Sequence, residues 1–160
     1  MSASQIIDRE MGISEFSQES GISLVTLRDW NKRGVSRFLG TPDERGHHRY
    51  FFSDLLAIEI AKRVNVSLRW KDAIHIGAVI ADHFIRIYNK TNSGEQASQR
   101  PFIGFFLQDV GDDWLIYKAV EDVSGLVDID AVNGVLMFNL HREYLHLPEH
   151  LRNALEAIAE

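Results

Sequence analysis

Apolar residues recur every three or four positions through most of the first 90 residues, which is the period of amphipathic helices. Ser14 is expected to cap a short helix that ends at Gly21, with Phe16 as its core anchor. Ser23 is expected to cap a second helix that continues to about Arg33. Only two residues separate these helices, so we predict that they cross steeply.

Two further helices are predicted after Val35–Gly46, whose turn-forming residues predict a loop or a short hairpin. Ser53 and Asp54 are expected to open the third helix, and Ser67 to cap a fourth that runs from Leu68 to about Tyr88. The fourth helix is apolar on nearly all sides and has no sustained heptad pattern. It is therefore expected to be buried by the C-terminal half of the chain or by another subunit.

The hydrophobic period changes to two after the polar segment 91–101, which is the predicted linker. Strands are predicted at Phe102–Val110, Trp114–Glu121, Val127–Ala131 and Val135–His141. A last helix begins at Pro148 and carries an apolar stripe made of Leu151, Ala154, Leu155 and Ile158. The pattern predicts an α+β chain whose second half, residues 102–160, is a four-stranded antiparallel sheet covered by this helix.

The net charge of −6 is unevenly distributed along the chain. Residues 23–71 hold ten Lys and Arg against five Asp and Glu, a local charge of +5. Residues 91–160 hold four against twelve, a local charge of −8. This asymmetry predicts a basic module that faces phosphates, joined to an acidic module with another task.

Composition excludes several classes of protein. The chain has no cysteine, which excludes disulfides, thiolate metal sites and cysteine nucleophiles. Its longest apolar stretch, residues 74–87, is interrupted by charged and histidine side chains and is too short to span a bilayer. The first ten residues lack the pattern of a secretory signal. A cytoplasmic protein is expected.

The most informative motif is the segment Gly46-His47-His48-Arg49-Tyr50, which follows the first two predicted helices. A DNA-binding wing needs a glycine at the bend and cations beside the DNA backbone, and this segment supplies both. Tyr50 is expected to anchor the wing in the core. The start of the second helix exposes small and cationic side chains suited to the major groove, while Leu24 and Leu27 turn inward.

Residues 12–75 resemble the winged-helix DNA-binding domain of the MerR family of bacterial transcription regulators. The resemblance rests on the order and spacing of Ile13–Ser17, Ser20–Ser23, Thr26–Arg28, Gly34, Gly46–Tyr50, Ser53–Leu55 and Val66–Leu68. It implies a winged helix-turn-helix within residues 1–90, with the long fourth helix at its end. It also implies a homodimer that binds double-stranded DNA through two recognition helices and two wings.

The predicted DNA-binding residues lie on the second helix, on the wing and at the start of the fourth helix. They are Ser23, Val25, Thr26, Arg28, Trp30, Lys32, Arg33, Arg37, Arg45, His47, His48, Arg49, Arg69 and Lys71. Two places differ from the family pattern, because His48 stands where an arginine is usual and Asp29-Trp30 replace a common tyrosine pair. Asp29 would repel phosphate, so it is expected to turn aside or to pair with Arg33, four residues further on.

The sequence predicts a bacterial or phage-encoded transcription regulator that uses no metal or cofactor and is not an enzyme. The histidines match no known zinc spacing, and the carboxylate pairs lie at turns or on one strand face. A protein partner or a small-molecule effector is expected at the C-terminal domain, and no membrane. Two alternatives stay open: an excisionase-like or packaging DNA-binding protein of a phage or mobile element, and a protein-interaction module that binds no DNA.

Overall fold

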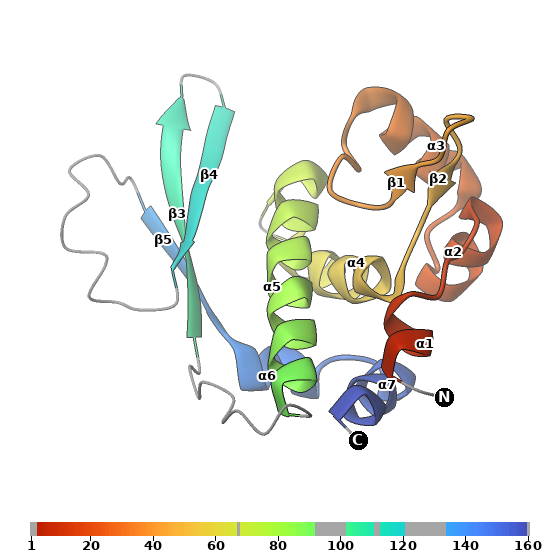
Figure 1. Ribbon diagram of the computed structural model, residues 1–160. Helices are drawn as coiled ribbons and strands as arrows, with labels where there is room; N and C mark the ends of the chain where they lie inside the picture. The colour runs from red at the N-terminus through yellow and green to blue at the C-terminus, as the bar shows by residue number, and fades with distance from the viewer. Residues whose placement is uncertain (1–2, 67, 92–101, 111–112, 121–133, 160) are drawn as a thin grey trace. The chain divides into compact units, whose positions relative to one another are not determined.

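The computed structural model describes residues 3–66, 68–91, 102–110, 113–120 and 134–159, which form helices and small antiparallel sheets (Figure 1). The α+β class is therefore confirmed. The chain divides into two compact units, Met1–Ala97 with Leu147–Glu160, and Ser98–His146. The helices of the first unit are α1 Ala3–Ile7, α2 Ile13–Ser20, α3 Leu24–Arg33, α4 Phe52–Val64, α5 Trp70–Thr91 and α7 Glu149–Ala159.

The first two predicted helices are present as α2 and α3, with one correction at the start of α2. This helix begins at Ile13 with Gly12 as its N-cap, so Ser14 lies inside the first turn and does not cap it. Gly21 ends α2 in the left-handed conformation, at φ 68°, as expected. At the start of α3 the Ser23 hydroxyl accepts a hydrogen bond from the Thr26 N–H at 3.1 Å.

A two-stranded hairpin and helix α4 follow α3. Strands β1 Thr41–Pro42 and β2 His48–Arg49 pair antiparallel. The hairpin is tied to α4 by Asp54, whose carboxylate accepts hydrogen bonds from the N–H groups of Gly40 at 3.0 Å and Phe51 at 2.7 Å. Burial raises the pKa of Asp54, and the two N–H donors oppose that rise.

Helix α5 packs against α4 at a close crossing. A Cβ atom at Gly77 would lie 2.2 Å from the carbonyl oxygen of Ala57, so only glycine allows this approach. The fourth predicted helix is thus present, but it starts at Trp70 rather than Leu68. Ser67, its expected cap, lies outside the described residues. Within the first unit α5 is covered by α4 on one side and by α7 on another.

Helix α7 differs most from expectation, because it packs on α1 and α5 in the first unit. The sequence pattern predicted that this helix covers the sheet, in a domain of residues 102–160. The apolar stripe itself was predicted correctly, and Leu151, Leu155 and Ile158 are buried. A stripe of this kind needs an apolar partner, and helices α1 and α5 supply one. The short helix α1 was not predicted.

The second unit contains β3 Phe102–Val110, β4 Asp113–Val120 and β5 Gly134–Asn139 in the antiparallel order β4-β3-β5, followed by α6 Leu140–Leu145. The third predicted strand, Val127–Ala131, lies wholly outside the described residues, and so does the linker 91–101 except for its first residue. The last strand stops at Asn139 and not at His141, because the Asn139 side chain accepts the Arg142 N–H at 3.0 Å and caps α6.

Candidate functional site

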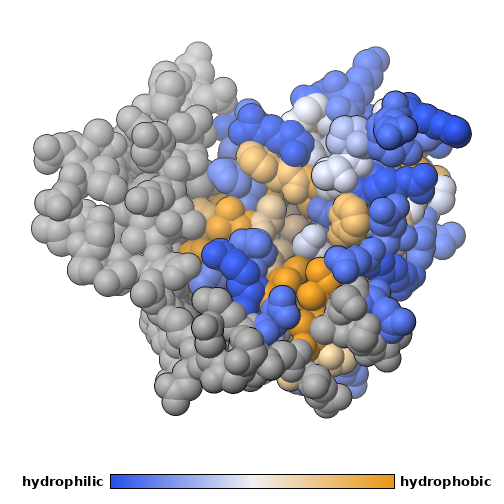
Figure 2. Space-filling model, in the orientation of Figure 1, coloured by the Kyte–Doolittle hydropathy of each residue, from blue (hydrophilic) through white to orange (hydrophobic). Residues whose placement is uncertain are grey.

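An open groove lies between the start of α2, helix α3 and the hairpin, and has a volume of about 630 Å³. We call it the cationic groove. Its charged and imidazole side chains are Arg28 from α3 and His47, His48 and Arg49 from the hairpin, and none of its lining residues is acidic. Figure 2 shows a mainly hydrophilic surface where Figure 1 draws the hairpin, α2 and α3.

Helix α3 presents one face to solvent and one to the core. Ser23, Val25 and Arg28 are exposed, with Val25 at 76%, and Thr26 is half-buried. Leu27 is fully buried beneath them, and Leu24 is half-buried. Gly34 ends the helix in the left-handed conformation, at φ 68°. The small and cationic residues predicted for the recognition surface therefore lie on the surface.

Trp30 is a correction to the predicted site. Its side chain is only 4% exposed, and its ring lies 4.8 Å from that of Trp70 at the start of α5. Trp30 follows Leu27 by three residues, so both side chains lie on the buried face of α3. Trp30 therefore holds α3 against α5 and cannot contact a macromolecule at this surface.

Tyr50 fixes the hairpin to the body of the unit, as predicted. Its ring is fully buried and stacks on Phe16 of α2, with centroids 4.1 Å apart and planes 6° apart. Its hydroxyl accepts a hydrogen bond from the Asn31 side chain of α3 at 3.0 Å. Two backbone hydrogen bonds join it to Met11: the Met11 N–H donates to the Tyr50 carbonyl at 2.8 Å, and the Tyr50 N–H donates to the Met11 carbonyl at 2.9 Å. One residue thus connects the hairpin to α2, to α3 and to the segment before α2.

Asp43 organises the tip of the hairpin. Its Oδ1 accepts the N–H groups of Arg45 at 2.9 Å and His47 at 2.8 Å, and its Oδ2 lies 3.5 Å from Arg49 Nη2. The His47 N–H, and in smaller part the Arg45 N–H and the neighbouring cations, hold the pKa of Asp43 below its ordinary value of 3.8. Asp43 therefore stays ionised at neutral pH and orients the turn that carries Arg45 and His47.

Replacing Asp43 by alanine should loosen the hairpin tip without unfolding the protein, because the tip is exposed. We expect faster amide exchange at Arg45 and His47, measured by NMR, and an unchanged melting temperature. The same hydrogen bonds in the wild type should persist until the pH falls below 3.8, through the lowered pKa of the carboxyl group. Glu44→Ala at the same turn is the control, and equal exchange in both variants would contradict this role.

The remaining predicted cations lie outside the cationic groove. Arg33 pairs with Asp29, as expected, and Arg69 pairs with Asp72 at 3.0 Å. The Arg37 guanidinium lies 4.5 Å above the ring of Phe38. Arg45 lines a smaller hollow at the hairpin tip, and Lys32 and Lys71 are exposed.

The groove also includes residues that were not predicted. The N-terminal end of α2 lines the groove through Gly12, Ile13 and Ser14, and the helix dipole there favours an anion. Asn31 of α3 adds a side-chain amide. Ser14 was predicted as a helix cap and not as a groove residue. Nothing in the sequence places Asn31 beside the hairpin.

No protein-family model matches the chain, and no curated protein matches it significantly. No helix in the described part of the chain is long and apolar enough to cross a membrane. Across the same residues, no three His, Asp or Glu side chains are grouped so that they could hold a metal ion.

Proposed function

We propose that this chain is a DNA-binding transcription regulator whose first unit is a winged helix-turn-helix of the MerR type. In this assignment α3 is the recognition helix, and the β1–β2 hairpin is the wing. The observation that carries the proposal is the cationic groove between them, which joins Arg28, His47, His48 and Arg49 without an acidic lining residue. A duplex backbone in this groove would receive positive charge from both sides.

The exposed face of α3 supports a role in reading bases. Val25 is 76% exposed next to Arg28, so the helix offers an apolar contact for a thymine methyl group and a guanidinium for phosphate or guanine. Ser23 and Thr26 add hydroxyl groups to this face. The two hydroxyls also hydrogen-bond to each other, and the Ser23 hydroxyl caps the helix by accepting the Thr26 N–H. Phosphate contacts from the hairpin would orient this face, and base contacts from α3 would supply specificity.

The proposal predicts a steep loss of duplex affinity with rising salt. Each phosphate that the protein neutralises contributes about −0.9 to the slope of log K against log salt. Affinity for a mixed-sequence duplex is measured by fluorescence anisotropy at several salt concentrations. If the folded protein bound no duplex, or bound it independently of salt, the proposal would be refuted. The first unit would then be interpreted as a protein-interaction module.

Single substitutions in the groove should weaken duplex binding. Arg28→Ala and Arg49→Ala are each expected to cost about 1–3 kcal/mol of binding free energy, and Arg49→Ala should also make the salt slope shallower by about one unit. Arg86→Ala is the matched control, because Arg86 is an exposed arginine of α5 paired with Asp82 at 2.9 Å, away from the groove. Equal losses in all three variants would show that binding follows total charge and not this groove.

A selection from random duplexes then separates a regulator from a DNA-organising protein of a phage or mobile element. One palindromic site would favour the regulator, and clustered direct repeats would favour the organising protein. A palindrome also requires two copies of the chain. Light scattering of the full chain at micromolar concentration would test the homodimer.

A further inference from the structure

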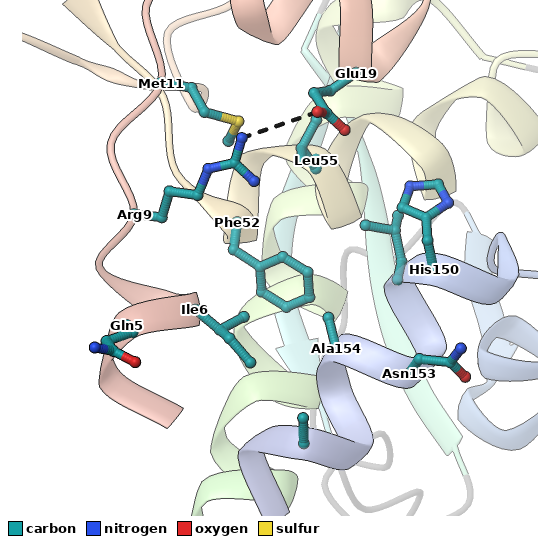
Figure 3. A pocket seen from close by; sticks show the side chains of 12 residues that line it. Gln5, Ile6, Arg9, Met11, Glu19, Phe52, Leu55, His150, Asn153 and Ala154 are labelled. Carbon is teal, nitrogen blue, oxygen red and sulfur yellow. Dashed lines mark ion pairs between the residues drawn. The ribbon is translucent and has the colours of Figure 1, made fainter. Parts of the chain in front are cut away.

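A second cavity lies on the first unit, among α1, the end of α2, α4 and α7, and has a volume of about 360 Å³ (Figure 3). Its apolar walls include Ile6, Met11, Phe52, Leu55, Ala154 and Ala157. Its polar rim includes Arg9, Glu19 and His150. The cationic groove shares none of these residues.

The volume of the cavity suits a small molecule. Ligand pockets of proteins measure roughly 300 to 1,000 Å³, and an apolar cavity of about 150 Å³ already holds benzene. The apolar walls therefore have room for a bicyclic aromatic ring or for one ring with a short chain. Phe52 points its ring into this space, with Ile6 and Ala154 close by (Figure 3).

The rim indicates which polar group such a molecule would carry. In the described part of the chain, both ion pairs of Arg9 are made through Nη2, with Glu15 and with Glu19. The Glu19 oxygen lies 3.9 Å away, at the outer limit of an ion pair, so it competes weakly for the guanidinium. Because Nη2 already donates to Glu15, a carboxylate on a molecule in the cavity would be received by the other N–H groups of the planar Arg9 fork.

We propose that this cavity binds a small molecule with an apolar, aromatic-sized body and one carboxylate, and that its occupancy stabilises the attachment of the hairpin. Met11 connects the cavity to the hairpin, because its side chain lines the cavity while its backbone forms hydrogen bonds with Tyr50 at 2.8 and 2.9 Å. A ligand that packs against Met11 restricts this segment and thereby the base of the hairpin. Binding itself does not depend on the proposed DNA-binding function, whereas an effect on DNA recognition would.

The test uses the full chain without DNA, and 1-naphthylacetate as the probe. Isothermal titration should show saturable binding, and the neutral analogue 1-naphthylacetamide should bind about threefold to tenfold more weakly because it lacks the charge that Arg9 receives. At saturation, amide exchange at Met11 and Tyr50 should slow. Bound probe should also raise the melting temperature, because it binds only the folded state.

Three variants and one control locate the site. Arg9→Gln should weaken naphthylacetate binding about threefold to tenfold, whereas Glu19→Gln should strengthen it by less than about threefold, because Glu19 competes only weakly for Arg9. Ala154→Leu places a larger side chain on the cavity wall and should abolish binding while the protein stays folded by circular dichroism. Arg86→Gln, an exposed arginine outside the cavity, should leave binding unchanged.

Several results would overturn the proposal. The first is that 1-naphthylacetate shows no saturable binding. The second is that 1-naphthylacetate and 1-naphthylacetamide bind with equal affinity. The third is that 1-naphthylacetate binds the wild type and folded Ala154→Leu equally. Binding without slower exchange at Tyr50 would refute the link to the hairpin. An affinity that falls as protein concentration rises would show instead that a second copy of the chain covers the cavity. Duplex binding is measured separately, so failure here does not count against the proposed function.

Discussion

Tyr50→Ala is expected to lower the free energy of unfolding by about 3–5 kcal/mol, the usual cost of removing a large buried aromatic ring. The ring is fully buried and stacked on Phe16, so its loss leaves a cavity between the hairpin and α2. The Asn31 side chain also loses its acceptor. Urea unfolding followed by circular dichroism would measure the change as a lower midpoint.

Tyr50→Phe is the matched control, because it keeps the stacked ring and removes only the hydroxyl. Its cost should be about 1 kcal/mol, the typical contribution of one hydrogen bond. The alanine variant should also lose duplex affinity at temperatures where it is still folded, since the hairpin is no longer held beside α3. A loss of stability below about 1 kcal/mol in Tyr50→Ala would mean that the ring does not anchor the hairpin.

Gly77→Val is expected to destabilise the first unit by about 3 kcal/mol or more. Overpacking a core costs about 1–3 kcal/mol when side chains can adjust, but here the new Cβ would lie 2.2 Å from a backbone oxygen of Ala57. A backbone oxygen cannot rotate away, so α4 and α5 must separate. Helix propensity works in the opposite direction but is worth less than about 1 kcal/mol.

Ala78→Val is the control for this variant, because it introduces the same β-branched side chain at the next, half-buried position of α5. Its effect should stay below about 1 kcal/mol. Thermal unfolding of both variants compares them directly. If Gly77→Val unfolded at the temperature of Ala78→Val, the close crossing of α4 and α5 would not be needed for stability.

The elements that could be predicted from the sequence are those with local determinants. Ser23 and Gly34 mark the two ends of α3 because their effects act within one helical turn. The period of two identified β3 from Phe102 to Val110 with both ends correct. The start of α2 was missed because Gly12 and Ser14 are both acceptable caps and only the backbone conformation distinguishes them.

The candidate site was predicted in part for the same reason. The hairpin segment and the exposed residues of α3 were visible as short motifs, and the structure brings Arg28 together with His47, His48 and Arg49. Trp30 was assigned to the wrong side of its helix, because its burial depends on Trp70, 40 residues further along the chain. Asn31 was missed because its role depends on Tyr50.

The sequence by itself determined the class of the fold, the ends of α3, the apolar stripe of α7 and the basic character of residues 23–71. These properties follow from capping, periodicity and charge, which act between residues close in the chain. The tertiary structure alone decided which surface the α7 stripe covers, which of the predicted side chains share a groove, and that a second cavity forms between α1, α4 and α7. Such pairings join residues far apart in the chain, and several apolar partners satisfy the same stripe, so only the folded packing selects among them.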